Sequence, residues 1–107
     1  MSRRTLWGIG SARAFRVHWA LQELGLDYQT KPVRTRTPAM ETPEFQLVSP
    51  RKKIPVFEDG DLKLFESCAI VSYLARTYGA GDKQLMPIDA AGQARCDEWS
   101  YFVATEL

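Results

Sequence analysis

The beginning of the chain constrains the fold most, because it places a short strand, a helix and a second strand in immediate succession. Residues 5–9 form a short apolar run with β-branched and aromatic side chains, which is typical of a buried strand. Ser11 stands where a helix N-cap belongs, and an apolar stripe at helical spacing follows, consisting of Ala14, Val17, Leu21 and Leu24. A second strand over residues 27–33 should then pair in parallel with the first, through a right-handed crossover.

The middle of the sequence predicts a loop and then a β-hairpin. Residues 34–43 contain two Thr-Pro pairs and several polar side chains, so we expect a loop, followed by a short helix over residues 44–48. Segment 54–65 has an Asp59-Gly60 pair at its centre, which supplies the positive-φ residues that a tight hairpin turn requires. The two strands that flank this pair should therefore be antiparallel.

A second amphipathic helix is predicted directly after the hairpin. It opens at Glu66-Ser67 and ends before Gly79, and its apolar stripe consists of Ile70, Val71, Leu74, Ala75 and Tyr78. The predicted order is strand, helix, strand, loop, strand, strand, helix. This order indicates an α/β fold with both parallel and antiparallel neighbours in one sheet.

The last part of the chain predicts one more helix. Residues 80–89 form a linker rich in Gly, Asp and Pro, and a helical pattern covers residues 90–107. Its apolar side consists of Trp99, Phe102, Val103 and Leu107. Because no other segment of the sequence is left to cover this side, we expect the helix to begin a second, all-α domain. Two alternatives stay open: the helix packs back on residues 1–79, or it pairs with a copy of itself in an oligomer.

Length and composition exclude several classes of protein. The 107 residues suffice for one compact domain, and 45% hydrophobic and 25% charged residues are ordinary for a soluble globular chain. No apolar run approaches the roughly 18 residues of a membrane-spanning helix, and the N-terminus does not match a signal peptide, so the cytoplasm is the expected location. Two separated cysteines and a single histidine do not predict a disulfide or a metal site.

The net charge of +1 conceals a basic first half. Residues 1–53 carry ten basic and four acidic side chains. This imbalance favours an anionic ligand. Nucleic acid is not expected, because the sequence has no interleaved aromatic platform and no recognisable reader motif.

Three positions in the sequence are candidates for binding chemistry. Ser11 lies at a strand–helix junction, where free backbone N–H groups favour an anion, although Ser11 taken alone is explained better as a plain N-cap. Pro55 begins a strand, which is consistent with a simple first-residue proline or with a cis bond that leaves the Ile54 backbone to pair with an extended peptide. At the next helix start, Glu66 can pair with an ammonium group, and Ser67 can hold a carboxylate or simply cap the helix.

In this order and spacing, the motifs resemble the N-terminal, thioredoxin-like domain of cytosolic glutathione S-transferases. The resemblance is carried by residues 6–29, 49–60 and 65–74, and it covers roughly residues 5–79. Residues 90–107 are similar to the first helix of that family's all-α C-terminal domain. The resemblance therefore implies a thioredoxin-like βαβ-ββα fold with a mixed four-stranded sheet, divided as 1–79, linker 80–89 and the beginning of a second domain.

The resemblance also implies a reaction. In the serine-type classes, such as theta and zeta, a serine at the position of Ser11 is the catalytic residue that activates the thiol of glutathione as a thiolate. The thiolate is then conjugated to a small electrophile. Glutathione is the expected co-substrate, no metal is expected, and relatives of this kind are usually homodimers.

The same resemblance implies how glutathione is held. Glu66 and Ser67 would bind the γ-glutamyl end, the Ile54 backbone beside a cis Pro55 would pair with the cysteinyl unit, and Lys53 would approach the glycyl carboxylate. Two other functions share this fold. One is a non-catalytic domain for dimerisation or assembly, and the other is a glutaredoxin-like thiol oxidoreductase, which would need a cysteine at the start of the first helix, where this chain has none.

Overall fold

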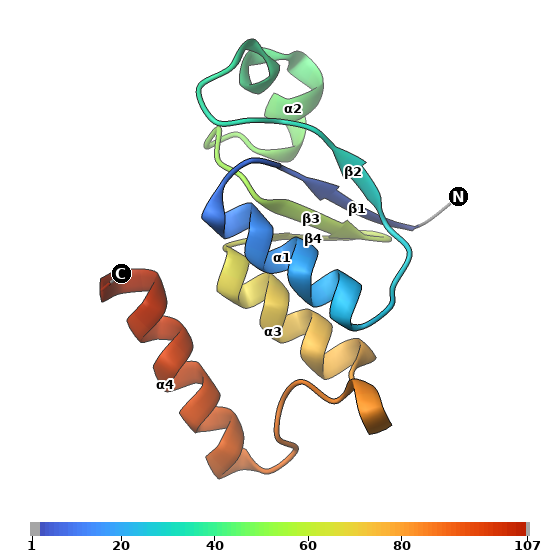
Figure 1. The fold of residues 1–107 in the computed structure, drawn as a ribbon. Coiled ribbons are helices and arrows are strands. Elements are labelled where there is room, and N and C mark those ends of the chain that lie inside the picture. Colours follow the sequence, from blue (N-terminus) through green and yellow to red (C-terminus); the bar gives the residue numbers. More distant parts are fainter. Residues whose placement is uncertain (1–2, 107) are drawn as a thin grey trace.

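The computed structural model describes residues 3–106, which form an α/β domain followed by a helix at its side (Figure 1). The strands are β1 (Arg4–Trp7), β2 (Gln29–Lys31), β3 (Val56–Asp59) and β4 (Leu62–Phe65). The α-helices are α1 (Ala12–Glu23), α2 (Pro43–Val48), α3 (Ser67–Tyr78) and α4 (Ala90–Glu106). Two short 3₁₀ helices are η1 (Pro38–Glu41) and η2 (Gly81–Lys83).

The four strands form one mixed sheet in the order β2-β1-β3-β4. β1 pairs in parallel with β2, and β3 pairs antiparallel with both β1 and β4. The predicted parallel crossover, the predicted hairpin and the mixed four-stranded sheet are therefore confirmed. The parallel pairing even continues beyond β1, because the Gly8 and Ile9 amides donate to the Lys31 and Val33 carbonyls at 3.0 Å each.

Side-chain alternation along the two central strands produces two cores, one on each face of the sheet. Leu6 and its partner Phe57 face α1 and α3, which lie side by side (Figure 1). One residue further along, Trp7 and its partner Val56 face the opposite side and pack with α2. The stripes predicted for α1 and α3 enter the first core through Val17, Leu21, Ile70 and Leu74, all fully buried.

Two local predictions were wrong in detail. The segment predicted as a loop contains the 3₁₀ helix η1, where Met40 is buried in the second core. The hairpin turn lies one residue later than predicted, since Gly60 and Asp61 form it and Asp59 remains in β3 opposite Leu62. In this turn Gly60 has a positive φ of +62°, whereas Asp59 and Asp61 do not. The Asp59 side chain instead makes buried hydrogen bonds.

Asp59 anchors the far end of β3 to α3 and to the chain's beginning. Its side chain is 2% exposed, and it accepts hydrogen bonds from Arg3 Nε at 2.7 Å, the Tyr73 hydroxyl at 2.7 Å and the Tyr78 hydroxyl. Burial acts to raise the pKa of Asp59, but the bonds from Tyr78, Tyr73 and Arg3 and the Arg3 charge outweigh it and hold the pKa below 3.8. The bond to Asp59 in turn raises the pKa of Tyr73 to about 12.

Helix α4 runs beside α3 and ends near its beginning (Figure 1). Cys68 Sγ donates to the Ser100 carbonyl at 3.6 Å, and Arg76 lies 4.0 Å from Asp97. The predicted apolar side stays largely uncovered, with Trp99 62% and Phe102 45% exposed, and Leu107 lies outside the described residues. Across residues 3–106, no helix combines the length and the hydrophobicity needed to cross a bilayer.

Replacing Asp59 with Asn should lower the free energy of unfolding by about 2–3 kcal/mol at neutral pH, because hydrogen bonds to a buried charge are lost. Because the pKa of Asp59 is lower in the folded state, its carboxylate contributes its full stabilisation at pH values above the ordinary pKa of 3.8. This stabilisation is lost as the pH falls through the pKa of the folded state. Urea denaturation followed by circular dichroism, at neutral pH and across the acid range, measures both effects.

Asp61→Asn is the matched control, because the same chemical change is made in the exposed turn next to β3. It should change the unfolding free energy by less than about 0.5 kcal/mol. An Asp59→Asn protein that is as stable as this control, or that keeps the full acid dependence of the unchanged chain, contradicts the anchoring role.

Candidate functional site

Ser11 caps α1, as its position in the sequence predicts. Its backbone is extended, with φ −130° and ψ 158°, and its Oγ accepts a hydrogen bond from the Ala14 amide at 3.2 Å. Because a hydroxyl carries one proton besides its acceptor lone pairs, capping leaves the Ser11 O–H as a donor. The positive end of α1 lies at the same place.

The turn that leads into Ser11 is held by the single histidine. His18 Nε2 lies 3.0 Å from the Gly8 carbonyl, which can only accept, so Nε2 carries a proton, and Nδ1 shares a hydrogen bond of 2.9 Å with the Tyr28 hydroxyl. Gly8 has a φ of +133°, and a Cβ there would lie 3.0 Å from Ile54 Cβ. The turn before α1 therefore packs directly against the segment that precedes β3.

A guanidinium group lies over the same turn. Gly10, with a φ of +77°, has no side chain, and a Cβ built there would come within 2.3 Å of Arg34 Nη1. The positive φ favours glycine at this position, and the flexible Arg34 side chain places a positive charge beside the residue that precedes Ser11. The sequence analysis did not single out Arg34, since it lies in the segment predicted as a loop.

The segment before β3 is fixed by a buried serine. Ser49 is 0% exposed, and its Oγ accepts from the Lys53 amide at 3.0 Å and donates to the Lys53 carbonyl at 2.9 Å. This pair of bonds fixes the backbone just before the Ile54-Pro55 peptide bond. That bond is cis, which confirms the prediction made from the sequence.

Helix α3 begins without a side-chain cap, unlike α1 and α2. Glu66 occupies the N-cap position with a φ of +73°, and its side chain makes no capping hydrogen bond, whereas Ser11 and Thr42 cap α1 and α2. Ser67 is the first helical residue, so the interpretation of Ser67 as the cap is wrong. Ser67 is 5% exposed, and its Oγ accepts a hydrogen bond from Arg16 Nη1 at 3.2 Å.

A cavity of about 290 Å³ brings together five of the six predicted site residues. These are Lys53, Ile54, Pro55, Glu66 and Ser67, and the remaining lining residues are Arg13, Arg16, Arg51, Cys68 and Ala104. Ser11, the sixth predicted residue, does not line this cavity. Four basic side chains and one acidic side chain line it, so the cavity suits a ligand with more negative than positive groups.

The three arginines of this cavity are not among the site residues predicted from the sequence. Arg13 and Arg16 are one helical turn apart and each directly precedes a residue of the buried α1 stripe, so they share one edge of the helix. That spacing could have placed both on one edge of α1, although it does not tell what this edge faces. Arg51 has no such periodic signal; its guanidinium stacks 5.4 Å from the Phe65 ring centroid.

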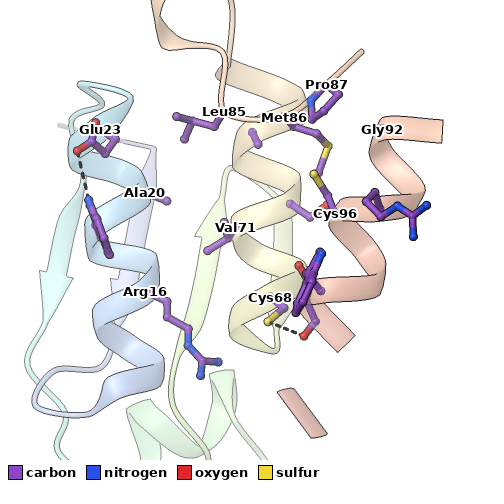
Figure 2. Close-up of a pocket in the computed structure, with 16 residues that line it drawn as sticks. Arg16, Ala20, Glu23, Cys68, Val71, Leu85, Met86, Pro87, Gly92 and Cys96 are labelled. Atoms are coloured by element: carbon purple, nitrogen blue, oxygen red, sulfur yellow. Dashed lines mark hydrogen bonds between the residues drawn. The ribbon is translucent and has the colours of Figure 1, made fainter. Parts of the chain in front are cut away.

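A larger cavity of about 840 Å³ lies between α1, α3, α4 and the segment before α4 (Figure 2). Its lining is mostly apolar, with Val71, Leu85 and Met86 among the contributors. None of the six predicted site residues lines it, but it shares Arg16 and Cys68 with the smaller cavity. The two cavities therefore meet at the beginning of α3.

The part of the chain from residue 3 to 106 has no group of three or more His, Cys, Asp or Glu side chains arranged to hold a metal ion. Cys68 and Cys96 are both free thiols, and each is partly buried.

Comparisons with known proteins agree with this arrangement. Residues 2–76 match the family model described as "Glutathione S-transferase, N-terminal domain". A "Glutathione S-transferase" from Hyoscyamus muticus is 38% identical over 89 residues, which are 83% of this chain and 42% of that protein. The chain spans less than half the length of such curated relatives.

Solved structures give the same result. A theta class glutathione S-transferase from Xanthomonas axonopodis pv. citri, with glutathione bound, superposes with a TM-score of 0.87 at 31% identity, covering 98% of this chain and 50% of that one. A glutathione transferase homologue from Drosophila mojavensis, with bound glutathione, has a TM-score of 0.88 at 32% identity, covering 98% and 48%.

Ser49→Ala should lower the free energy of unfolding by about 1–3 kcal/mol, because it leaves the Lys53 amide and carbonyl without their buried partner. Urea denaturation measures this loss. Ser72→Ala is the matched control: its hydroxyl accepts only an exposed bond from Arg76, so less than about 0.5 kcal/mol should be lost. Equal stability of the two variants contradicts a role for Ser49 in fixing the segment before β3.

Proposed function

Because this chain belongs to the glutathione S-transferase family, we propose that it binds glutathione in the 290 Å³ cavity and presents the thiol for conjugation to a small electrophile. In this reaction the thiolate sulfur forms a bond to an electrophilic carbon, and the leaving group departs with its electron pair. The enzyme contributes activation of the nucleophile and proximity.

One observation carries the proposal: α3 starts inside the cavity with no side chain capping it, between a carboxylate and a buried hydroxyl. The free N–H groups and positive end of a helix attract a carboxylate, while Glu66 attracts an ammonium group. The γ-glutamyl end of glutathione carries both groups on one carbon. Glu66 and Ser67 therefore bind this end.

The rest of the peptide follows the lining of the cavity away from α3. The Ile54 backbone, which the cis Pro55 leaves outside the sheet ladder, pairs with the cysteinyl unit as a strand would. Lys53 approaches the glycyl carboxylate. The surplus of positive charge in the lining strengthens binding of a ligand with two carboxylates and one ammonium group.

Ser11 does not line the 290 Å³ cavity, but it lies two residues before Arg13, which does. In this proposal Ser11 activates the thiol at the edge of the cavity. A thiol with an ordinary pKa of about 8.5 needs roughly 2.7 kcal/mol of selective stabilisation for its pKa to fall by about two units. A hydrogen bond from the Ser11 hydroxyl to the thiolate supplies about 1.5–3 kcal/mol, and the start of α1 supplies about 0.3–1 kcal/mol. Ser11 thus acts as in the serine-type, theta- or zeta-like classes.

The proposed division of the chain places glutathione binding in residues 1–79, a linker in 80–89 and the first helix of an all-α domain in 90–107. Because the relatives are about twice as long, the electrophile and its site are also proposals, as are homodimer formation and a cytoplasmic location. A second function, a non-catalytic assembly module, is favoured by the exposed Trp99 and Phe102 on α4, which are suited to protein contacts.

Ser67→Ala should weaken glutathione binding by about tenfold or more, since a buried hydrogen bond to a carboxylate is lost. Ser11→Ala should leave the affinity nearly unchanged, because Ser11 acts on the thiol. Titration calorimetry and retention on a glutathione resin measure both. Equal retention of the Ser67→Ala variant and the unchanged chain contradicts the role of Ser67, and an unchanged chain that passes through the resin favours the assembly module.

Ser11→Ala should raise the pKa of the bound glutathione thiol toward its ordinary value, by about one unit or more. An ultraviolet titration of thiolate absorbance, with glutathione at saturating concentration, measures this pKa in both proteins. Ser67→Ala, assayed at saturation, is the control and should leave the thiol pKa unchanged. The same thiol pKa with and without the Ser11 hydroxyl would exclude Ser11 as the activator.

A further inference from the structure

Arg16 makes a contact that the proposed binding of glutathione does not yet use. It extends from α1 toward the beginning of α3, where Cys68 is labelled in Figure 2, and its Nη1 donates to Ser67 Oγ at 3.2 Å. Residues 16 and 67 are far apart in sequence, so this bond joins two helices exactly where the 290 Å³ cavity is formed.

The bond fixes the direction of the Ser67 hydroxyl. A guanidinium group has only donors, so the Ser67 oxygen must accept from Arg16. A hydroxyl that accepts from Arg16 keeps its single proton for another partner, and Ser67 lines the cavity together with Arg16. At 5% exposure, Ser67 has little water to compete for that proton. Arg16 therefore prepares Ser67 as a donor to an acceptor within the cavity.

Arg13 provides a contrast on the same helix. It lines the same cavity one turn earlier and carries the same charge, but it is exposed and makes no hydrogen bond to Ser67. Arg13 therefore serves as a control for the removal of one positive charge from the lining of the cavity. A contribution made through the Ser67 hydroxyl should belong to Arg16 alone.

We propose that Arg16 is a positioning residue for ligand carboxylate recognition, acting through Ser67 rather than as an independent charge. This inference rests on the proposed function, because glutathione is the ligand whose carboxylate Ser67 receives. Arg16 also lines the 840 Å³ cavity and is half-buried, so the residue that orients Ser67 lies where the two cavities meet.

A double-mutant cycle on the full chain tests the proposal, with reduced glutathione as the titrant in calorimetry. Arg16→Ala should weaken binding by about tenfold, whereas Arg13→Ala should weaken it by less than about threefold. When Ser67→Ala is already present, adding Arg16→Ala should weaken glutathione binding no more than adding Arg13→Ala does, because no hydroxyl is left for Arg16 to orient.

Arg16→Lys separates the effect of the charge from that of the guanidinium geometry, and it keeps a long aliphatic side chain between the two cavities. It should recover less than half of the affinity lost in Arg16→Ala, since an ammonium group on a shorter side chain does not reproduce the guanidinium bond. Urea denaturation midpoints of all variants identify any that are unfolded, and Arg16→Lys carries the test if Arg16→Ala is one of them.

The outcomes are distinct. If the unchanged chain does not bind glutathione, the proposed function fails and this inference falls with it. If the chain binds and the losses from Arg16→Ala and Ser67→Ala simply add, or if Arg16→Lys restores full affinity, the proposed function stands and Arg16 is only a charge. Loss that disappears in the Ser67→Ala background supports the positioning role.

Discussion

The antiparallel pairing of β1 with β3, extended by β4, decides where the candidate site forms. Trp7 lies opposite Val56, and Val56 lies opposite Phe65, so one row of residues crosses three strands at the same edge of the sheet. The chain leaves or enters each strand just beyond this row, at the turn before α1, at Ile54-Pro55 and at Glu66. Segments separated by about half of the sequence are thereby brought to one edge, where loops carry the binding groups on a rigid sheet.

Buried side-chain hydrogen bonds fix both ends of β3, with a carboxylate at one end and a hydroxyl at the other. At one end, the carboxylate of Asp59 gathers two tyrosine hydroxyls and Arg3, which fastens the hairpin to α3. At the other, Ser49 holds the backbone of Lys53 ahead of the cis peptide bond. The buried polar groups of β3 and its approach are thus satisfied within the fold, so the positions next to the cavity do not shift independently of the core.

Most helices and strands could be predicted because helical and strand periodicities show which side chains are buried. In this fold the buried side chains form one core on each face of the sheet. The residue pattern left Pro55 open between a first-residue strand proline and a cis bond, and the resemblance favoured the cis bond that the structure shows. The position of Asp59 in the strand could not be predicted, because an Asp-Gly pair is normally a turn signal. Burial of this carboxylate is stabilised by the hydroxyls of Tyr73 and Tyr78, which only the tertiary structure brings to it. Arg16 was missed for the same reason: its partner is 51 residues away, and no local pattern records that contact.

The bridge from Tyr28 through His18 to the Gly8 carbonyl joins a strand's approach, the middle of α1 and the end of β1. These side-chain hydrogen bonds join the parts of the strand–helix–strand unit, in addition to the backbone hydrogen bonds between β1 and β2. These contacts restrain the turn before Ser11, so that it has little conformational freedom left to lose when a ligand binds. A ligand that meets this turn encounters a surface whose ordering cost has already been met, so more of its contact energy remains as affinity.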